Sequence, residues 1–422
     1  MIRQIHGFAG GAALALLALS APALATNGYF ENGYGVQSQG LGGAAIAYPK
    51  DALAIATNPA TLSALGDRLD VGAELFIPSR GAELDNTAGG FGVFDGSFSG
   101  NGKSSFVIPQ IGYAHRLNDQ WSVGIAVYGN GGMNTSYSTN PYFGSPGTAG
   151  VNLSQLFVSP TLSYEFAKGH TIGLSAKVID QFFEARGVGL FGGYSSNAGA
   201  LSDRGKDSAY GIGGSVGYFG QWTPDLSVGA FWQSKVYTEK FQKYAGLFEG
   251  QGSFDVPSTY GLGIAYKITP DLDLAADLTR IEYANVGAVG NSIAGLFLGQ
   301  QLGSDNGPGF GWENVTTIKA GLNYRIDPQW QVRGGWAYNT QPVQGEQTLF
   351  NILAPGVVQH HFTAGATWTT PAGFDVSGFA LYAPRTEVTG NGVIPASFGG
   401  GNVKVHLSEV SVGIALGWKL GD

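Results

Sequence analysis

The chain has 422 residues, a formal net charge of −8 and no cysteine, and only 12% of its residues are charged, against 69 glycines and 12% aromatic residues. This balance excludes a basic nucleic-acid-binding surface, disulfides and thiolate metal sites. Little charge argues against a set of soluble domains, and no run of eighteen apolar residues follows residue 25, so the composition favours a transmembrane β-barrel over transmembrane helices.

The first 25 residues have the three parts of a secretory signal peptide. Arg3 supplies a positive charge, residues 8–19 form an apolar core, and residues 23–25 read Ala-Leu-Ala, an A-x-A cleavage site. A single membrane anchor is the alternative, but the apolar run is too short for one. We therefore expect residues 1–25 to be removed and the mature chain to start at Thr26.

Residues 26–67 do not share the pattern of the rest of the chain. The part from residue 40 to 67 is apolar and rich in Ala and Gly, and Pro49 and Pro59 interrupt it. It alternates too poorly for a strand and is broken too often for one long helix. We expect a compact irregular segment ahead of the β-structure.

From residue 68 onward, apolar residues recur at every second position. In the first such segment Leu69 and Val71 alternate with Asp70 and Gly72. One face is apolar with aromatic residues near its ends, and the other is small or polar, as expected of strands between lipid and a lumen. About fourteen segments of this kind start near residues 69, 105, 121, 152, 170, 208, 225, 256, 271, 313, 329, 358, 373 and 404. We predict an all-β fold, a transmembrane antiparallel β-barrel of about 14 strands over residues 68–422.

The connections between these segments alternate between short and long. The short ones carry Pro and Asp, which suit tight turns, and lie at residues 117–120, 167–170, 222–225, 268–271, 326–329 and 369–373. Long loops rich in Gly, Ser and Asn lie between them, at about residues 80–104, 130–150, 184–206, 242–253, 284–310, 341–357 and 386–402. Short periplasmic turns and long extracellular loops are typical of outer-membrane barrels, and an even strand number puts both ends of the barrel wall on the periplasmic side.

One long loop has apolar residues at helical spacing. Residues 290–302 place Ile293, Leu296, Phe297 and Leu298 where a short amphipathic helix would group them. An exposed apolar group of this kind would meet lipid or an apolar ligand. The alternative is that these side chains pack on neighbouring loops.

The motifs that could carry catalysis are weak. Residues 213–217 match G-x-S-x-G, but they fall within a strand pattern, whereas a nucleophile elbow needs a strand-to-helix turn. His360 and His361 would point to opposite faces of a strand and so cannot share a metal. We expect no enzyme activity, no metal and no cofactor.

Several cations fall on the predicted lumen side of their strands, namely Lys177, Lys267, Lys319, Arg325 and Arg333. A buried cation needs a partner. One interpretation is an internal ion pair with Glu74, Asp273, Asp277 or Glu409. The other is an anchor for a ligand carboxylate or another anionic head group in an apolar pocket, with Lys177, Lys319, Arg325 and Arg333 as candidates.

Three stretches together resemble the FadL/TodX family of outer-membrane transporters for hydrophobic compounds. The first is SQGLGGA at residues 38–44, followed by Asp51 and by Asn58-Pro59-Ala60. The second is VPSTYGLGIAYKITPDLDLAADLTR at residues 256–280, and the third is WENVTTIKAGLNYRIDPQWQVRGGWAYNTQPV at residues 312–343, each similar to a hairpin of the family. The resemblance covers essentially the whole mature chain.

The resemblance implies that residues 26–67 form a hatch, or plug, inside the barrel. Extracellular loops would capture a hydrophobic substrate, which would move to a pocket near the mature N-terminus, formed with Thr26, Asn27, Gly28, Tyr29 and Phe30. A change in the hatch, at the motif residues Asn58, Pro59 and Ala60, would release it. A kink in the third strand, at Gly129, Gly131 and Gly132, would open the wall sideways, although these glycines also fit the start of a loop.

The resemblance further implies passive transport in the bacterial outer membrane, with a monomer, a hydrophobic ligand and membrane lipid as the expected partners. The chain departs from the family at its end, GWKLGD, where a terminal aromatic residue is common; Trp418 lies four residues earlier. The loops carry no obvious basic pair for a carboxylate, so long-chain fatty acids and neutral hydrocarbons both remain open. A general diffusion porin and a surface adhesion barrel are the alternative functions.

Overall fold

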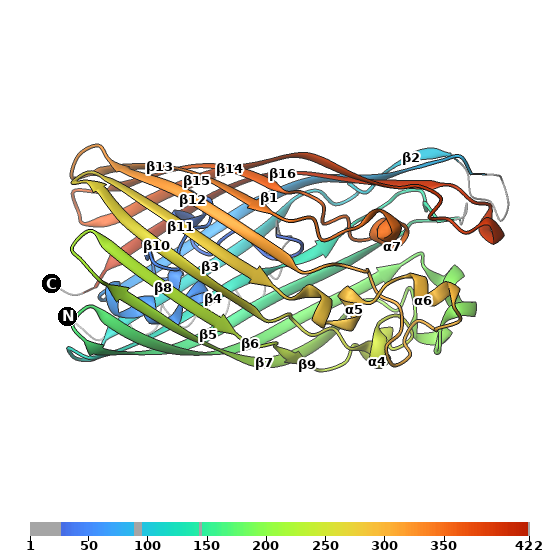
Figure 1. The fold of residues 1–422 in the computed structure, drawn as a ribbon, viewed down its shortest axis with the longest axis horizontal. Coiled ribbons are helices and arrows are strands. Elements are labelled where there is room, and N and C mark those ends of the chain that lie inside the picture. Colours follow the sequence, from blue (N-terminus) through green and yellow to red (C-terminus); the bar gives the residue numbers. More distant parts are fainter. Residues whose placement is uncertain (1–26, 88–94, 143–145, 421–422) are drawn as a thin grey trace.

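The computed structural model describes residues 27–87, 95–142 and 146–420, and the predicted signal peptide and Thr26 lie outside the described residues. Its strands form one closed antiparallel sheet (Figure 1). The strands of the wall are β1 (Arg68–Asp85), β3 (Phe106–Arg116), β4 (Trp121–Asn134), β5 (Gly150–Ala167), β6 (His170–Arg186), β7 (Asp207–Gln221), β8 (Leu226–Gln233), β10 (Thr259–Thr269), β11 (Leu272–Ile281), β12 (Val315–Arg325), β13 (Trp330–Asn339), β14 (His360–Thr369), β15 (Phe374–Gly390) and β16 (Asn402–Lys419).

The wall closes where the last strand pairs with the first. The β1–β16 ladder runs from Arg68↔Lys419 to Asp85↔Asn402. Two short strands extend the sheet beside longer neighbours: β2 (Gly96–Ser99) pairs with β1, and β9 (Tyr237–Thr238) pairs with β7. The prediction of a barrel of about 14 strands is confirmed, and each predicted start lies within three residues of a strand's first residue.

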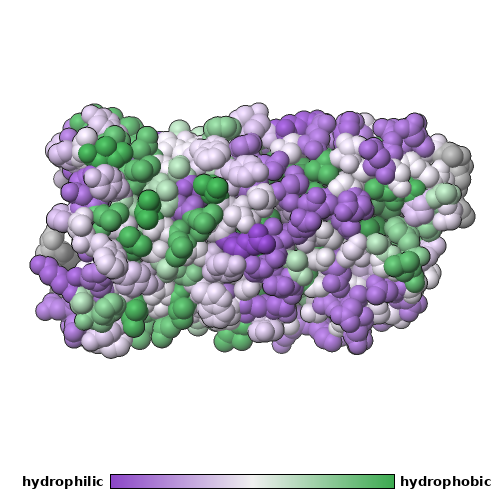
Figure 2. Space-filling model, in the orientation of Figure 1, coloured by the Kyte–Doolittle hydropathy of each residue, from purple (hydrophilic) through white to green (hydrophobic). Residues whose placement is uncertain are grey.

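The two faces of the strands differ as the alternation predicts. Along β10, Tyr260, Leu262 and Ile264 are exposed, whereas the glycines between them face the interior. Figure 2 shows hydrophobic residues gathered over the left half of the molecule, where the strands end in short turns, and hydrophilic residues over most of the right half. The apolar face therefore forms a belt on the outside of the wall, as a bilayer requires. None of the helices among the described residues has the length and apolar character needed to cross a bilayer.

The two ends of the barrel differ in their connections, and we call them the turn end and the loop end (Figure 1). The described parts of the loops carry short helices: η2 (Gly189–Tyr194), η3 (Ala198–Ala200), η4 (Gln242–Tyr244), α4 (Glu249–Gly252), η5 (Tyr283–Asn285), α5 (Gly287–Gly290), α6 (Ala294–Phe297), η6 (Gly345–Gln347), α7 (Thr348–Asn351) and η7 (Ala396–Phe398). Within the predicted amphipathic region, the helical residues are Gly290, which ends α5, and the four residues of α6. Ile293 and Leu296 are buried among the loops, whereas Phe297 and Leu298 are 41% and 85% exposed, so these four side chains do not form one surface.

Residues 27–66, which we call the N-terminal segment, lie inside the wall (Figure 1, dark blue). The segment contains α2 (Val36–Gln39), α3 (Ala54–Thr57) and η1 (Pro59–Ala64), and most of its residues are buried. Helix α2 contacts β14, β15, β16 and β1, and η1 contacts β4 to β7. Because these strands lie on different sides of the closed wall, the segment fills the barrel interior from one side to the other.

Candidate functional site

Asn58, in the predicted hatch motif, connects two parts of the N-terminal segment with each other and with the wall. Its side chain is fully buried, and its amide nitrogen donates to the carbonyl oxygens of Ile46 (2.8 Å) and Tyr218 (3.0 Å). Its Oδ1 accepts from the backbone N–H of Ala60 (3.1 Å) and so caps η1, where Pro59 occupies the first position. Asn and Pro are favoured at these two positions of a helix start.

The wall accommodates this motif through two glycines that face each other across the β6–β7 ladder, Gly173 and Gly217. A Cβ atom at Gly173 would lie 2.3 Å from the carbonyl carbon of Pro59 and 2.4 Å from the nitrogen of Ala60. A Cβ at Gly217 would lie 2.0 Å from Oδ1 of Asn58. All three distances are far shorter than van der Waals contact, so only glycine permits this approach. Gly217 is the last residue of the G-x-S-x-G match, which thus has a packing role here.

Two further glycine pairs receive other parts of the segment. Gly229 and Gly263, paired across β8 and β10, both contact Ile46. Gly321 and Gly335, paired across β12 and β13, lie against Leu41, and a Cβ at Gly335 would come within 2.1 Å of the Gly42 nitrogen. We call these three pairs the glycine seats. They let the backbone of the N-terminal segment lie directly on the backbone of the wall.

Inward-facing charges hold the same segment by its backbone. Asp277 accepts from the N–H groups of Ala45 (2.7 Å) and Ile46 (3.0 Å). Lys177, fully buried, donates to the carbonyl oxygen of Ala56 (2.9 Å) and to the hydroxyl of Tyr128 (3.1 Å). Charge-assisted hydrogen bonds of this kind are the stronger ones in proteins.

The other predicted head-group candidates lie in different surroundings. Lys319 donates to the carbonyl oxygen of Asn32 (2.6 Å), and Arg333 donates to Oγ1 of Thr367 (2.7 Å). Arg325 is exposed at the turn end of β12. Among the described residues, none of the four predicted cations lies within ion-pair distance of a carboxylate. The inward positions of Lys177, Lys319 and Arg333 could be predicted from strand parity, but backbone carbonyls as partners for Lys177 and Lys319 could not.

Asp51 lies buried in the N-terminal segment and accepts from the N–H groups of Gln37 (3.3 Å) and Leu53 (3.1 Å). Burial, with the negative charge of Asp70 beside it, raises the pKa of Asp51 from 3.8 to about 7. A carboxyl with a raised pKa binds its proton more tightly in the packed state than in the unpacked state. Packing of the segment therefore loses stability as the pH rises from about 4 to about 7, and changes little from this source above that range.

We expect amide hydrogen exchange, corrected for intrinsic rates, to show faster local opening around residues 35–57 at pH 8 than at pH 5.5. In Asp51→Asn, which keeps the shape but cannot ionise, this part of the pH dependence should disappear. An Asp51→Asn protein with the same pH dependence as the unaltered chain would show that other groups control the opening.

The predicted kink glycines lie where the wall is interrupted. The β3–β4 ladder ends at Gln110↔Tyr128, and the β4–β5 register shifts between Gly129 and Gly131. Gly131 has a φ of 142°, which favours glycine. Beyond this point β4 pairs with the N-terminal segment in place of β3: Glu31 N donates to Asn130 O (3.0 Å), and Gly132 N donates to Tyr29 O (2.9 Å). We call this region the β3–β4 gap.

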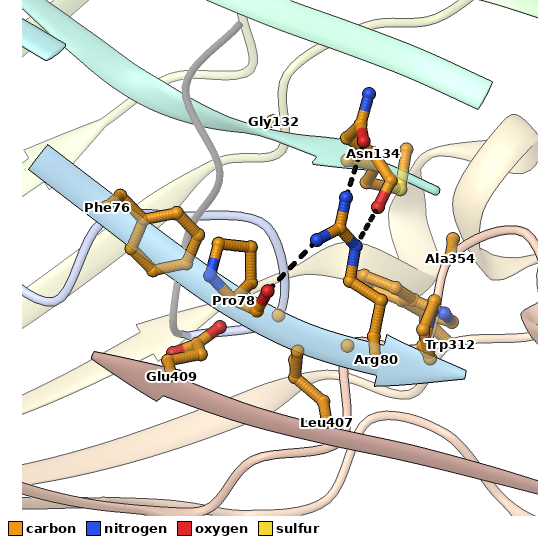
Figure 3. A pocket seen from close by; sticks show the side chains of 13 residues that line it. Phe76, Pro78, Arg80, Gly132, Asn134, Trp312, Ala354, Leu407 and Glu409 are labelled. Atoms are coloured by element: carbon orange, nitrogen blue, oxygen red, sulfur yellow. Dashed lines mark hydrogen bonds between the residues drawn. The ribbon is translucent and has the colours of Figure 1, made fainter. Parts of the chain in front are cut away.

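Arg80 of β1 crosses the same region from the loop end (Figure 3). Its guanidinium donates to the carbonyl oxygens of Asn134 (2.7 Å), Pro78 (3.1 Å) and Lys103 (2.6 Å) and to Oδ1 of Asn134 (2.5 Å). With Trp312, Leu407 and Glu409 it lines a cavity of about 330 Å³. Arg80 was not among the predicted residues. Its position could have indicated it, because it lies an even number of residues from Asp70 and Glu74 and so points to the same, inward side of the strand.

Aromatic side chains fix the start of the segment. Tyr29 packs against Phe30, Phe254, Tyr283 and Trp312, with ring centroids 5.1–6.1 Å apart. The hydroxyl of Tyr283 donates to the carbonyl oxygen of Asn27 (2.5 Å) and accepts from the N–H of Tyr29 (3.1 Å). A Cβ at Gly28 would meet this same Tyr283 ring at 2.7 Å. Asn27, Gly28, Tyr29 and Phe30 thus lie together where the segment meets η5.

Two further cavities flank this region. The first, which we call the loop pocket, lies among the loops and is lined by apolar side chains such as Phe191, Phe248, Phe310 and Phe350. The second, the N-terminal pocket, lies between the segment and strands β8 to β12. Phe30, Tyr34, Ala56 and Thr57 line its inner side. The predicted loop residues Ile293, Leu296, Phe297 and Leu298 are not among the lining residues of the loop pocket.

The structure thus combines a closed barrel, an internal N-terminal segment, a gap beside the third strand and apolar pockets. The model of the outer membrane protein transport family OMPP1/FadL/TodX matches residues 17–417. The chain belongs to this family. Its location is therefore the bacterial outer membrane.

Solved structures agree with this FadL/TodX assignment in fold. The Pseudomonas putida toluene transporter TodX has a TM-score of 0.65 at 17% identity, covering 93% of this chain and 99% of that one. A Pseudomonas aeruginosa FadL homologue has a TM-score of 0.67 at 13% identity, covering 92% and 98%. The Ralstonia pickettii toluene transporter TbuX has a TM-score of 0.64 at 18% identity, covering 92% and 99%.

A curated relative matches in sequence over a shorter span. It is an outer membrane protein of Neisseria meningitidis serogroup B, 34% identical over 122 residues, which are 28% of this chain and 26% of that protein.

Proposed function

We propose that the protein takes up hydrophobic small molecules, either long-chain fatty acids or hydrocarbons, by passive diffusion across the outer membrane. The observation that carries the proposal is the N-terminal segment, which spans the interior and pairs with β4 at the β3–β4 gap. In this role the segment is a hatch, and Asn58-Pro59-Ala60 is the part that gates it. The toluene transporters among the structural neighbours support the choice of an apolar substrate.

Capture begins in the loops. The loop pocket is lined almost entirely by apolar side chains, and burying apolar surface there favours a hydrophobic molecule by about 25 cal/mol per Å². The substrate then moves to the N-terminal pocket, which Phe30 and Tyr34 line from the hatch side. All these parts belong to one chain, so we expect a monomer to be sufficient for transport.

Release takes place sideways through the wall. At the β3–β4 gap the strands do not pair with each other, so separating them breaks no hydrogen bonds of the β3–β4 ladder. The bonds that must break include those of Tyr29 and Glu31 with β4 and those of Arg80 with Asn134. Movement of the hatch start would therefore open a path from the lumen to the membrane, where an apolar substrate is stable.

A reversible cross-link tests this exit. The natural chain has no cysteine, so a Glu31→Cys/Asn130→Cys pair provides the only thiols, at two positions joined by a backbone hydrogen bond (3.0 Å). We expect oxidation to lower uptake of radiolabelled toluene and oleate several-fold and reductant to restore it, because the disulfide holds the hatch start on β4.

The matched control is Val332→Cys/Ala366→Cys, a pair already neighbouring in the β13–β14 ladder. Oxidation of this pair should leave uptake unchanged. Full uptake by the oxidised Glu31→Cys/Asn130→Cys protein would contradict a sideways exit at the β3–β4 gap.

A further inference from the structure

The N-terminal pocket is more polar than a pocket for pure hydrocarbon requires. Strands β10, β11 and β12 each contribute a threonine to its wall, Thr259, Thr279 and Thr317, and β12 also contributes Lys319. Asn27 and Glu31 line it from the N-terminal segment. The loop pocket, by contrast, has no charged lining residue among those described.

Three of these polar groups are buried and have no hydrogen-bonding partner among the described residues. They are Oδ1 of Asn27, Oε1 of Glu31 and Oγ1 of Thr317, in side chains whose residues are 3%, 5% and 1% exposed. Buried polar atoms in native proteins almost always have a partner. The three atoms come from two sides of the pocket, the N-terminal segment and β12, so a single group bound between them would contact both.

The chemistry of the three atoms restricts that group. The amide oxygen of Asn27 can only accept a hydrogen bond, whereas the hydroxyl of Thr317 can donate or accept. A bare hydrocarbon would leave all three unpaired. A carboxylate cannot donate to Asn27, would lie near Glu31, and would find only Lys319 as a cation among the described lining residues, where the ammonium already donates to Asn32 (2.6 Å).

We infer that the N-terminal pocket selects neutral amphiphiles with a hydroxyl head group, such as medium-chain alcohols and alkylphenols, over alkanes and carboxylates of the same size. The hydroxyl donates to Asn27 or Glu31 and accepts from Thr317, and the tail lies against Phe30 and Ile281. This inference rests on the proposed uptake of hydrophobic molecules and extends their chemical class to neutral molecules with a hydroxyl group.

The test is equilibrium binding of radiolabelled 1-octanol, octane and octanoate to the full-length protein in lipid nanodiscs, with empty nanodiscs subtracted. We expect 1-octanol to bind at least about threefold more tightly than the other two, the gain of roughly one net hydrogen bond. Thr317→Val, which keeps the shape and removes the hydroxyl, should lower the affinity for 1-octanol about threefold to tenfold and leave octane unchanged.

Two variants serve as controls for Thr317→Val. Thr161→Val removes a buried hydroxyl of β5 that is not part of the pocket, and should leave all three affinities unchanged. Thr317→Ser keeps the hydroxyl and should retain the preference. If Thr317→Val does not fold, the comparison of three ligands on the unaltered chain still decides.

Any of three results would overturn the inference while leaving the proposed uptake of hydrophobic molecules intact. Octane could bind as tightly as 1-octanol, octanoate could bind most tightly of the three, or Thr317→Val could lower the affinities for octane and 1-octanol equally. If none of the three ligands binds, the result would instead contradict the proposed function itself.

Discussion

Replacing Gly173 and Gly217 together by alanine should unseat the hatch and make the barrel leak. The two methyl groups would lie 2.0–2.4 Å from atoms of Asn58, Pro59 and Ala60, and two of the contacted atoms are backbone that cannot rotate away. Overpacking costs about 1–3 kcal/mol per site, so the two sites together should raise the open population by at least about tenfold. Influx of a small sugar into proteoliposomes measures this leak.

The barrel should stay folded in this double variant, because alanine is compatible with the β6–β7 ladder. Gly214→Ala is the matched control: it lies on the same strand β7, and its added Cβ has no neighbour closer than Ser175 O at 3.7 Å. Sugar influx in the double variant equal to that in Gly214→Ala would show that the glycine seat does not hold the hatch closed.

Asn58→Ala should lower uptake of a hydrophobic substrate about tenfold while the barrel remains folded and heat-modifiable. The change removes three hydrogen bonds and leaves the oxygens of Ile46 and Tyr218 without their donor. Ala56 and Thr57, which line the N-terminal pocket, directly precede Asn58. Loss of their support weakens substrate binding at the step before release.

Asn118→Ala, in the exposed turn between β3 and β4, is a suitable control, since it removes an asparagine cap far from the pocket. Uptake of radiolabelled oleate and toluene into cells with equal amounts of folded protein is the measurement. Unchanged uptake in Asn58→Ala would mean that the motif caps η1 without gating release.

The wall of the barrel could be predicted from the sequence because its signal is local. Alternation has a period of two residues, and each strand such as β10 or β16 carries it independently of its neighbours. The short turns are local as well, since Pro and Asp act on their own backbone. The resemblance to the family then supplied two predictions, that residues 26–67 form a hatch and that Asn58 belongs to the motif that gates it.

The glycine seats could not be predicted in the same way. Gly173 looks like any small residue on the lumen side of a strand, and the reason for it is Pro59, more than a hundred residues earlier in the chain. The partners of Lys177 are equally non-local, since the carbonyl of Ala56 is 121 residues away. Strand parity predicts that a side chain points inward, but only the docked segment determines what it meets there.

The glycine seats also bear on how the barrel assembles. The N-terminal segment is made first, yet its partners are distributed along the whole wall, from β1 to β16. The N–H of Gly42, for example, donates to Thr363 of β14, 321 residues away. Contacts of such high sequence separation form late and together. The segment can dock fully only when the first and last strands are about to meet, so its docking depends on the number and the register of the strands. A wall with one strand too few, or with a strand in the wrong register, would not bring Gly173, Gly263 and Gly335 to the segment at once.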